Sequence, residues 1–147
     1  MTTPTGSLMR GLLRWLPAIA WMSVIFLLSS QSGLRATTDV DVEKPIRIVA
    51  HLGTYALLGG LFLYAICALH APSGRQALLA IGLSAAYAVS DEIHQALVPS
   101  RSGRAEDVVV DIVGAALGVA VGAVILATLE RARSGDGMQP EGLDTER

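Results

Sequence analysis

Residues 90–111 read SDEIHQALVPSRSGRAEDVVVD, a stretch denser than any other in the chain in groups that exchange protons or bind ions. It lies between two of the most apolar segments of the protein, residues 77–89 and 112–126. Charged side chains beside hydrocarbon are costly unless they have partners, and they usually mark a site with a function. The contrast between this stretch and its surroundings therefore predicts a polar site next to the nonpolar interior of a membrane.

The composition of the chain indicates that a membrane is its solvent. Of the 147 residues, 52% are hydrophobic and 16% are charged, whereas a soluble domain has about 25% charged residues. The net charge of −2 and the lack of any nucleic-acid-binding motif argue against a nucleic-acid partner. The single cysteine, Cys67, excludes an intramolecular disulfide and a zinc site built from cysteines.

The apolar segments predict an all-α fold, namely a polytopic membrane protein with four transmembrane helices in a bundle. The expected spans are about residues 12–30, 46–69, 76–95 and 105–129. Each is close to the ~20 residues that cross a hydrocarbon core. Residues 1–11 and 130–147 are expected to be flexible tails on either side of the domain at 12–129. Arg10 and Arg14 before the first apolar run also fit a cleaved signal peptide, but a retained first helix is favoured because it keeps four spans.

Four spans bring the polar residues to one membrane face, where the first and third helices end and the second and fourth begin. Arg47, His51 and Tyr55 follow one another at four-residue spacing, so they share one face of the second helix. Asp91 and His94 share a face at the end of the third helix. The candidate site residues expected at this membrane face are Ser30, Gln31, Arg47, His51, Tyr55, Asp91, His94, Gln95, Arg101, Arg104, Asp107 and Asp111.

Two kinds of role are expected in this set. The candidates for catalysis are His51, Tyr55, Asp91, His94, Gln95 and Asp107. An imidazole titrates near neutral pH, and a neighbouring carboxylate fixes its tautomer and raises its basicity. The candidates for substrate binding are Ser30, Gln31, Arg47, Arg101, Arg104 and Asp111. Guanidinium groups bind phosphate through paired hydrogen bonds, although Arg101 could instead neutralise Asp91 or Asp107, and polar contacts between membrane helices often serve only to hold them together.

Several assignments stay open at this point. Water, Ser29, Ser30 or Ser90 could act as a nucleophile, and no GxSxG motif selects among them. A metal site of two histidines and two aspartates is an alternative, but no residue is assigned as a metal ligand and the cofactor is unknown. Glu92 and Glu106 are expected to be solvated and without a role. The glycines of the fourth span recur every four residues, and we expect them to pack against a neighbouring helix.

The polar residues also form motifs with a recognisable order. They comprise the block Ser90 to Gln95, Pro99-x-Arg101, Asp107 and Gly114-x-x-x-Gly118, preceded by Ser29-Ser30-Gln31 and by Arg47-x-x-Ala50-His51-x-x-x-Tyr55-x-Leu57-Leu58-Gly59. With these motifs, residues 12–126 resemble the VanZ-like family of small membrane proteins. The resemblance implies a helical bundle in the membrane. It also implies that His51, Tyr55, Asp91, His94, Gln95, Arg101 and Asp107 matter for function, without assigning them a reaction.

Two positions depart from the pattern of that family. The family often has Asn where this chain has Asp111, and often Glu where this chain has Thr54. An additional acid at position 111 alters the local charge, and the loss of the acid at position 54 weakens a pairing of His51 with a carboxylate there.

The expected function is to bind, or to act on, a lipid-linked or glycopeptide-type headgroup in the cell envelope, because the family is named for a protein linked to resistance to the glycopeptide teicoplanin. A non-catalytic scaffold or binding protein and a small proton-coupled carrier are alternatives, although no inverted repeat is evident. The sequence leaves open whether the protein is an enzyme and which oligomer it forms. The expected location is the cell membrane with several spans. Basic residues in loops favour the cytoplasmic side of a membrane, and five of them flank each side of this bundle. Those expected inside the polar site are not free in a loop and are not counted. The larger remaining number therefore predicts that the termini lie in the cytoplasm and the polar site outside.

Overall fold

The structure is a computed structural model of the 147-residue chain, and it describes residues 9, 11–32, 40–99 and 101–135. The described residues form helices joined by short turns, without a strand among them, so the predicted all-α fold is confirmed. The long helices are α2 (Leu16–Ser29), α3 (Val40–Cys67), α4 (Gly74–Leu97) and α5 (Ala105–Gly135).

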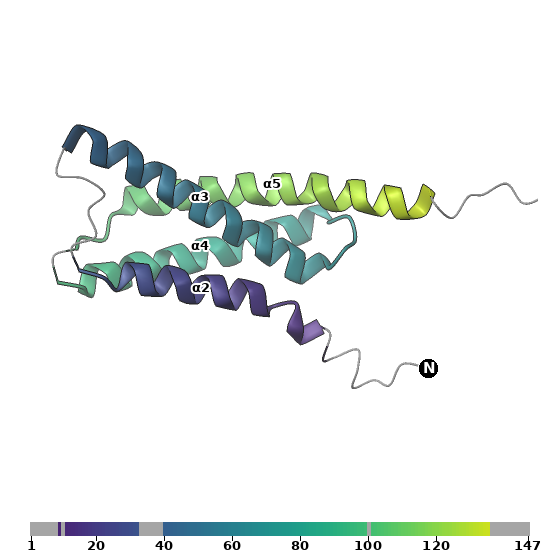
Figure 1. The fold of residues 1–147 in the computed structure, drawn as a ribbon, viewed down its shortest axis with the longest axis horizontal. Helices are drawn as coiled ribbons and strands as arrows, with labels where there is room; N and C mark the ends of the chain where they lie inside the picture. Colours follow the sequence, from purple (N-terminus) through teal and green to yellow (C-terminus); the bar gives the residue numbers. More distant parts are fainter. Residues whose placement is uncertain (1–8, 10, 33–39, 100, 136–147) are drawn as a thin grey trace, which may run out of the picture.

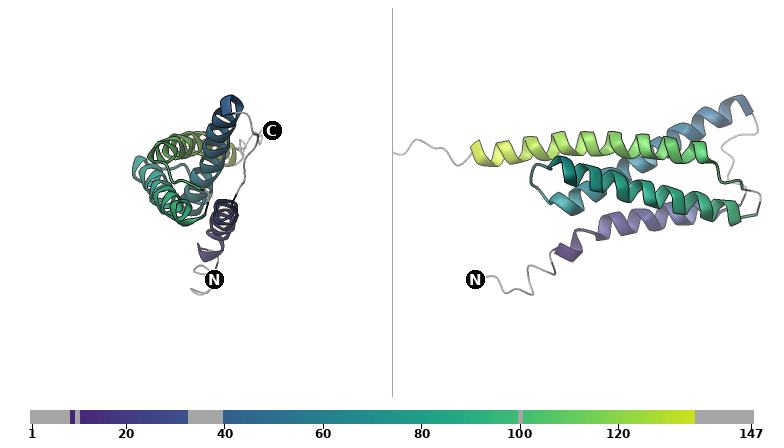
Figure 2. Two further views of the ribbon diagram at one scale, coloured as in Figure 1. Left: turned by 90° about the vertical axis from the view of Figure 1, so that its left-hand side faces the viewer. Right: turned by 180° about the vertical axis from the view of Figure 1, so that it is seen from behind.

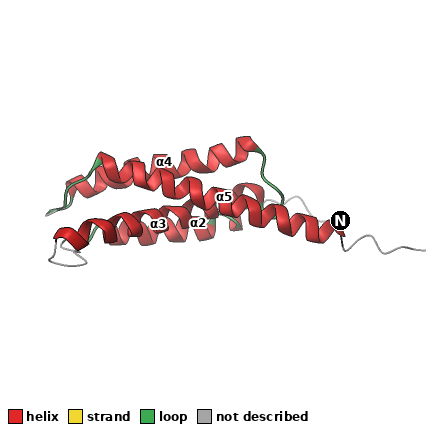
Figure 3. Cartoon of the chain, turned by 90° about the horizontal axis from the view of Figure 1, so that it is seen from above, coloured by secondary structure: helices red, strands yellow, loops and turns green. Residues whose placement is uncertain are grey.

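The four helices run lengthwise through the molecule with alternating direction (Figures 1 and 3). Helices α2 and α4 end on the left of Figure 1, where α3 and α5 begin, so the polar segments meet at one end of the bundle as predicted. We call this the polar end. Viewed toward that end, α3, α4 and α5 pack around one another and α2 lies on the outside of the group (Figure 2). Side-chain hydrogen bonds attach the middle of α2: Trp21 Nε1 donates to Thr54 O at 3.0 Å, and the Tyr87 hydroxyl donates to Met22 O at 2.6 Å.

Among the described residues, three helical segments are long and apolar enough to cross a membrane, namely Gly11–Ser29, Val42–Cys67 and Ala105–Ser134. Large apolar side chains such as Leu27, Val49 and Val124 are exposed on their outer faces, which is the pattern expected of a surface in contact with lipid. Helix α4 has 24 residues, enough to span a hydrocarbon core at about 1.5 Å per residue. It is less apolar than the others because its last turns carry the polar residues of the predicted site. The protein is therefore a helical membrane protein.

Helices α3 and α5 are packed together with their backbones in close contact. An added Cβ at Gly118 would overlap the carbonyl of Ala56, and one at Gly114 would overlap the carbonyl of Leu52. From the other helix, a Cβ at Gly59 would lie 2.5 Å from the carbonyl oxygen of Ala115. Small residues let membrane helices approach in this way, so the packing role predicted for the glycines of the fourth span holds for this crossing.

Two helix boundaries differ from those expected. Helix α3 begins at Val40, where acidic residues suit a helix start, rather than near residue 46, so Pro45 lies inside the helix instead of opening it. Helix α5 continues to Gly135 rather than ending at 129, and the Glu130 carboxylate accepts a 2.8 Å hydrogen bond from Ala71 N in the α3–α4 turn. The remainder of the two predicted tails, residues 1–8, 10 and 136–147, and residues 33–39 of the first polar loop lie outside the described residues.

Candidate functional site

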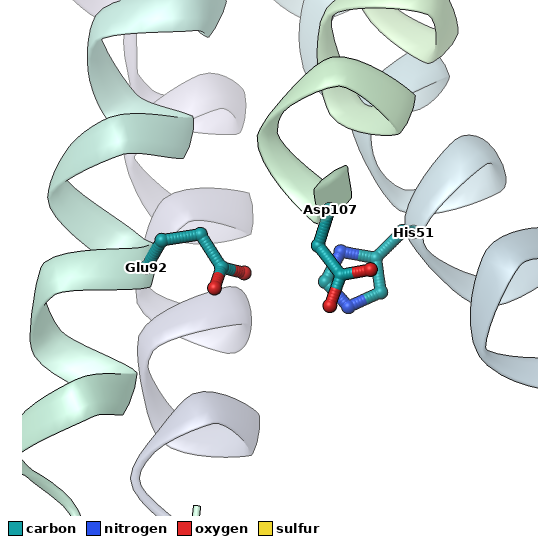
Figure 4. A group of neighbouring side chains, drawn as sticks. All are labelled: His51, Glu92 and Asp107. Carbon is teal, nitrogen blue, oxygen red and sulfur yellow. The ribbon is translucent and has the colours of Figure 1, made fainter. Parts of the chain in front are cut away.

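Three helices each contribute one titratable side chain to a group at the polar end. His51 comes from α3, Glu92 from α4 and Asp107 from α5, and one nitrogen or oxygen atom of each lies within 4.8 Å of the other two. Figure 4 shows the Asp107 carboxylate beside the His51 ring, with the Glu92 side chain extending from α4 toward both. Glu92 and Asp107 are each only 6% exposed. We call His51, Glu92 and Asp107 the three-helix cluster.

The position of Glu92 contradicts the expectation that this acid is solvated and without a role. The buried face of α4 contains Ala80, Ser84 and Ala88, and the next four-residue step along the same stripe reaches Glu92. This stripe of small residues was visible in the sequence and could have placed Glu92 inside the bundle. Glu106, by contrast, is exposed as expected, and its carboxylate lies 3.8 Å from the exposed guanidinium group of Arg104.

His51 is paired with a carboxylate of α5. Its Nδ1 lies 2.9 Å from Oδ1 of Asp111, which has no exposed surface. A carboxylate only accepts hydrogen bonds, so Nδ1–H is the donor and Nε2 is left for other partners. At position 54, where the VanZ-like family often has Glu, this chain has Thr and so no carboxylate to pair with His51. Asp111 of the neighbouring helix supplies that carboxylate instead. Such a pair holds an imidazole in one tautomer and orientation, as a proton-transfer group or a metal ligand requires.

Glu92 is held in place by backbone and side-chain donors. Arg104 N donates to its Oε2 at 2.7 Å, and Gln95 Nε2 lies 3.3 Å from its Oε1 and 3.0 Å from Asp91 Oδ2. The loop can supply this backbone donor because Gly103 lies against α4, where a Cβ would overlap the carbonyl of Glu92. Arg104 therefore contributes its backbone to the site, while its side chain points outward.

Arg101 joins the end of α2 to the end of α4. Its Nε and Nη2 donate to the carbonyl oxygens of Gln31 and Leu28 at 3.0 and 3.1 Å, and its Nη1 donates to Gln95 Oε1 at 3.2 Å. The last carbonyls of a helix need external donors, so Arg101 caps α2. Neither of the direct ion pairs considered for it, with Asp91 or Asp107, is present among the described residues. Gln31 takes part through its backbone oxygen, and its side chain is exposed.

His94 faces α2 instead of the three-helix cluster. Its Nε2 lies 3.0 Å from Ser30 Oγ, and its ring stacks on Phe26 with centroids 4.6 Å apart. Because Ser30 Oγ donates its own proton to Phe26 O at 2.6 Å, the His94 nitrogen is the donor to that hydroxyl. In this arrangement the Ser30 proton points to Phe26 O rather than to His94. His51 and His94, both expected at this membrane face, contact different neighbours, since residue 94 lies beside the buried stripe of α4 rather than on it.

A small cavity of about 130 Å³ lies between α2, α3 and α4 at the polar end. Its walls are formed by Ile25, Leu28, Ser29, Ala50, His51, Thr54, Tyr55, Asp91, Gln95 and Arg101. Six of the predicted site residues belong neither to this wall nor to the three-helix cluster beside it: Ser30, Gln31, Arg47, His94, Arg104 and Asp111. Of these, Arg47 and Asp111 still contact the cluster directly, Arg47 through Nε at 3.7 Å from Asp107 Oδ1.

The polar end contains buried polar atoms that lack a partner. Within the described part of the chain, three buried side-chain atoms have no hydrogen-bond partner: Arg47 Nε, the Tyr55 hydroxyl and Asp111 Oδ2. Each such atom costs about 1–3 kcal/mol when nothing pairs with it. The three belong to α3 and α5 residues at or next to the cluster and the cavity, and Tyr55 is only 1% exposed. Arg47 Nε can donate a hydrogen bond, Asp111 Oδ2 can accept one, and the Tyr55 hydroxyl can do either, so the three atoms suit a bound polar group.

Comparison with known proteins gives one match. A family model described as VanZ/LLP1 matches residues 14–126, which include α2, α3, α4 and all of the predicted site residues. No curated protein and no solved structure matches the chain.

Proposed function

The chain belongs to the VanZ/LLP1 family, and from that premise we propose that it binds the headgroup of a lipid-linked molecule of the cell envelope at the polar end of the bundle. The observation that supports this most directly is the partnerless Tyr55 hydroxyl in the wall of the 130 Å³ cavity, with Arg47 Nε and Asp111 Oδ2 also partnerless beside the three-helix cluster. A membrane protein has little reason to bury them unless a ligand pairs with them. Polar groups inside a membrane bundle are generally kept because they bind or transfer something.

The size of the cavity limits what can enter it. A water molecule in the liquid occupies about 30 Å³, so the cavity holds a group of only a few non-hydrogen atoms, such as a phosphate, an amide or a sugar hydroxyl. Its wall offers the Tyr55 hydroxyl and Arg101 as donors and Asp91 as an acceptor. The remainder of the headgroup then lies at the membrane surface, with its lipid chain along the exposed apolar faces of the helices.

The polar end is proposed to face the outside of the cell membrane. Arg47 and Arg101 contact other residues of the bundle, so they do not act as free cytoplasmic charges. Discounting them leaves more basic residues flanking the opposite end, which favours that end in the cytoplasm. An alkaline phosphatase domain fused after the last residue is expected to be inactive in cells, and an active fusion would reverse this orientation.

A scaffold without a headgroup ligand is the second candidate. Its support is the contact of Arg101 with both α2 and α4, together with the His51–Asp111 pair that joins α3 to α5. In this case the polar residues hold the helices together, and a partner protein binds elsewhere.

Lipid mass spectrometry of the protein purified in mild detergent from its native membrane distinguishes the two. We expect a lipid-linked sugar or phosphate species with the unaltered protein and with the control His70→Gln, whose residue lies in the exposed turn at the opposite end. The Tyr55→Phe and Asp91→Asn variants are expected to retain at least about tenfold less of this lipid than the unaltered protein. The reason is that one lost polar contact is worth about 1.4 kcal/mol or more in a buried site.

The same variants can be compared in cells. If the proposal is correct, expression of the unaltered protein and of His70→Gln lowers susceptibility to teicoplanin, while Tyr55→Phe does not. Equal lipid retention by all variants, or no lipid-linked species with any of them, would contradict headgroup binding. Full activity of Asp91→Asn in cells without a bound lipid would support the scaffold.

A further inference from the structure

We propose that His51, Glu92 and Asp107 bind a divalent transition-metal ion of the zinc and manganese class, with Asp111 as a positioning residue for His51. This goes beyond headgroup binding and does not rest on it, because its ligands are the residues of the three-helix cluster, of which only His51 also lines the cavity.

The geometry of the cluster is close to that of a metal site. The three potential ligand atoms lie within 4.8 Å of one another. Ligand pairs bound tetrahedrally to one such ion at about 2.1 Å lie about 3.4 Å apart, so binding draws the three side chains together by about an ångström. Asp107 is free to move because Arg47 Nε, at 3.7 Å, is beyond hydrogen-bond distance. One imidazole and two carboxylates suit zinc, manganese or iron, and three protein ligands leave positions open for water or a further ligand.

The residues behind the ligands support the same assignment. A metal-bound histidine nearly always donates its other ring N–H to a carboxylate or carbonyl. His51 Nδ1 does so to Asp111 Oδ1 at 2.9 Å, which leaves Nε2 for an ion, and the Asp107 carboxylate lies beside the ring (Figure 4). Independently of these bonds, the Tyr55 hydroxyl is buried, has no partner among the described residues, and lines the same cavity as His51. A water molecule on the open side of an ion would provide such a partner.

The charges of the polar end also favour a bound cation. Four carboxylates are buried there, those of Asp91, Glu92, Asp107 and Asp111. The arginines in contact with this region are Arg47 and Arg101. When all four are ionised and His51 is neutral, as a metal ligand is, two negative charges remain beyond the two arginines, and uncompensated charge in a low-dielectric interior is expensive. One divalent cation balances them.

The metal content of the full chain tests the proposal. The protein is purified in detergent without chelator or metal-affinity resin and analysed by inductively coupled plasma mass spectrometry for zinc, manganese and iron. Zn²⁺ and Mn²⁺ are then titrated calorimetrically into chelator-treated protein. We expect about one ion per chain and a metal-dependent rise in the melting temperature. Glu92→Gln and His51→Gln are expected to lose binding. Asp111→Asn is expected to weaken it by about 10- to 100-fold, as for other residues that orient a metal ligand.

Two matched controls separate the cluster from the rest of the surface. Glu106→Gln removes an exposed acid of the same helix end, and His94→Gln removes a histidine that faces α2; both should bind metal like the unaltered protein. Glu92→Gln keeps an oxygen to accept the Arg104 N–H, so it should fold, and size-exclusion chromatography with circular dichroism checks this. Absence of Zn²⁺ and Mn²⁺ binding by the unaltered protein, or equal binding by folded Glu92→Gln, would overturn the proposal. Either result would leave headgroup binding untouched, because that test relies on Tyr55 and Asp91.

Discussion

The contacts between α3 and α5 include two regions that are packed in opposite ways. Where Gly114 and Gly118 meet Leu52 and Ala56, the backbones touch and no space is left for even one more carbon atom. One to two turns nearer the polar end, the same helices bury Arg47 Nε and Asp111 Oδ2 without a partner. The first region leaves no buried polar side-chain atom without a partner, whereas the second leaves two such atoms without one among the described residues.

The difference indicates how the two regions divide the work. The glycine crossing brings α3 and α5 close together and fixes their separation, which no polar contact in a membrane could do as firmly. That separation in turn determines how near His51 comes to Asp107 and Asp111. Proteins often concentrate unfavourable local features at functional sites and compensate for them elsewhere. In this protein, the close packing of the glycine crossing compensates for the partnerless polar atoms. It lies one or two helix turns from them, in the same pair of helices.

The largest effect is expected from breaking the crossing. Gly118→Leu inserts a side chain where a Cβ alone would overlap the carbonyl of Ala56, so α3 and α5 must separate. We expect a destabilisation of more than about 3 kcal/mol, seen as loss of a monodisperse peak in fluorescence-detected size-exclusion chromatography. The control is Gly82→Leu on α4, where nothing lies within 4 Å of the added Cβ. Equal behaviour of the two variants would show that the crossing is not the close contact described above.

A smaller effect of opposite sign is expected at the polar end. Tyr55→Phe removes a buried hydroxyl that has no partner among the described residues, so the ligand-free protein should become more stable by about 1–2 kcal/mol. Thermal unfolding in detergent by differential scanning fluorimetry measures this change. Tyr87→Phe is the matched control, because its ring lies 6.5 Å from that of Tyr55 but its hydroxyl donates to Met22 O. That variant should lose about 1 kcal/mol instead. A loss of stability in both would mean that the Tyr55 hydroxyl already has a partner in the ligand-free protein.

Much of the fold followed from the order of apolar and polar segments. Alternating segments of membrane-spanning length require helices that cross in alternating directions, so the polar ends had to meet at one face. The glycines at four-residue intervals in the fourth span indicated a close helix contact, and the structure has it. The helix ends were predicted less well, since Val40 and Gly135 depend on local charge and on contacts such as that between Glu130 and Ala71.

The candidate site was only partly accessible from the sequence. Helical spacing correctly grouped Arg47, His51 and Tyr55 on one side of α3, all of which contact the cluster or the cavity. The same spacing also grouped Asp91 with His94, yet Asp91 lines the cavity and His94 contacts α2. Two residues can share one broad face of a helix while the ends of their side chains contact different neighbouring helices. Glu92 was missed for the converse reason, because its charge was given more weight than its place on the buried stripe.

The sequence by itself determined that this protein is a bundle of membrane helices with its ionisable residues gathered at one end, because hydrophobicity and segment length are properties of the chain alone. Only the tertiary structure decided which of those residues meet. The 3.6-residue period states which side chains share a face of a helix, but not how far the helix is rotated toward its neighbours. That rotation comes from packing. The contact of the glycines of α5 with α3 accompanies the pairing of His51 with Asp111, and the packing of α4 places Glu92 inside the bundle and His94 against α2.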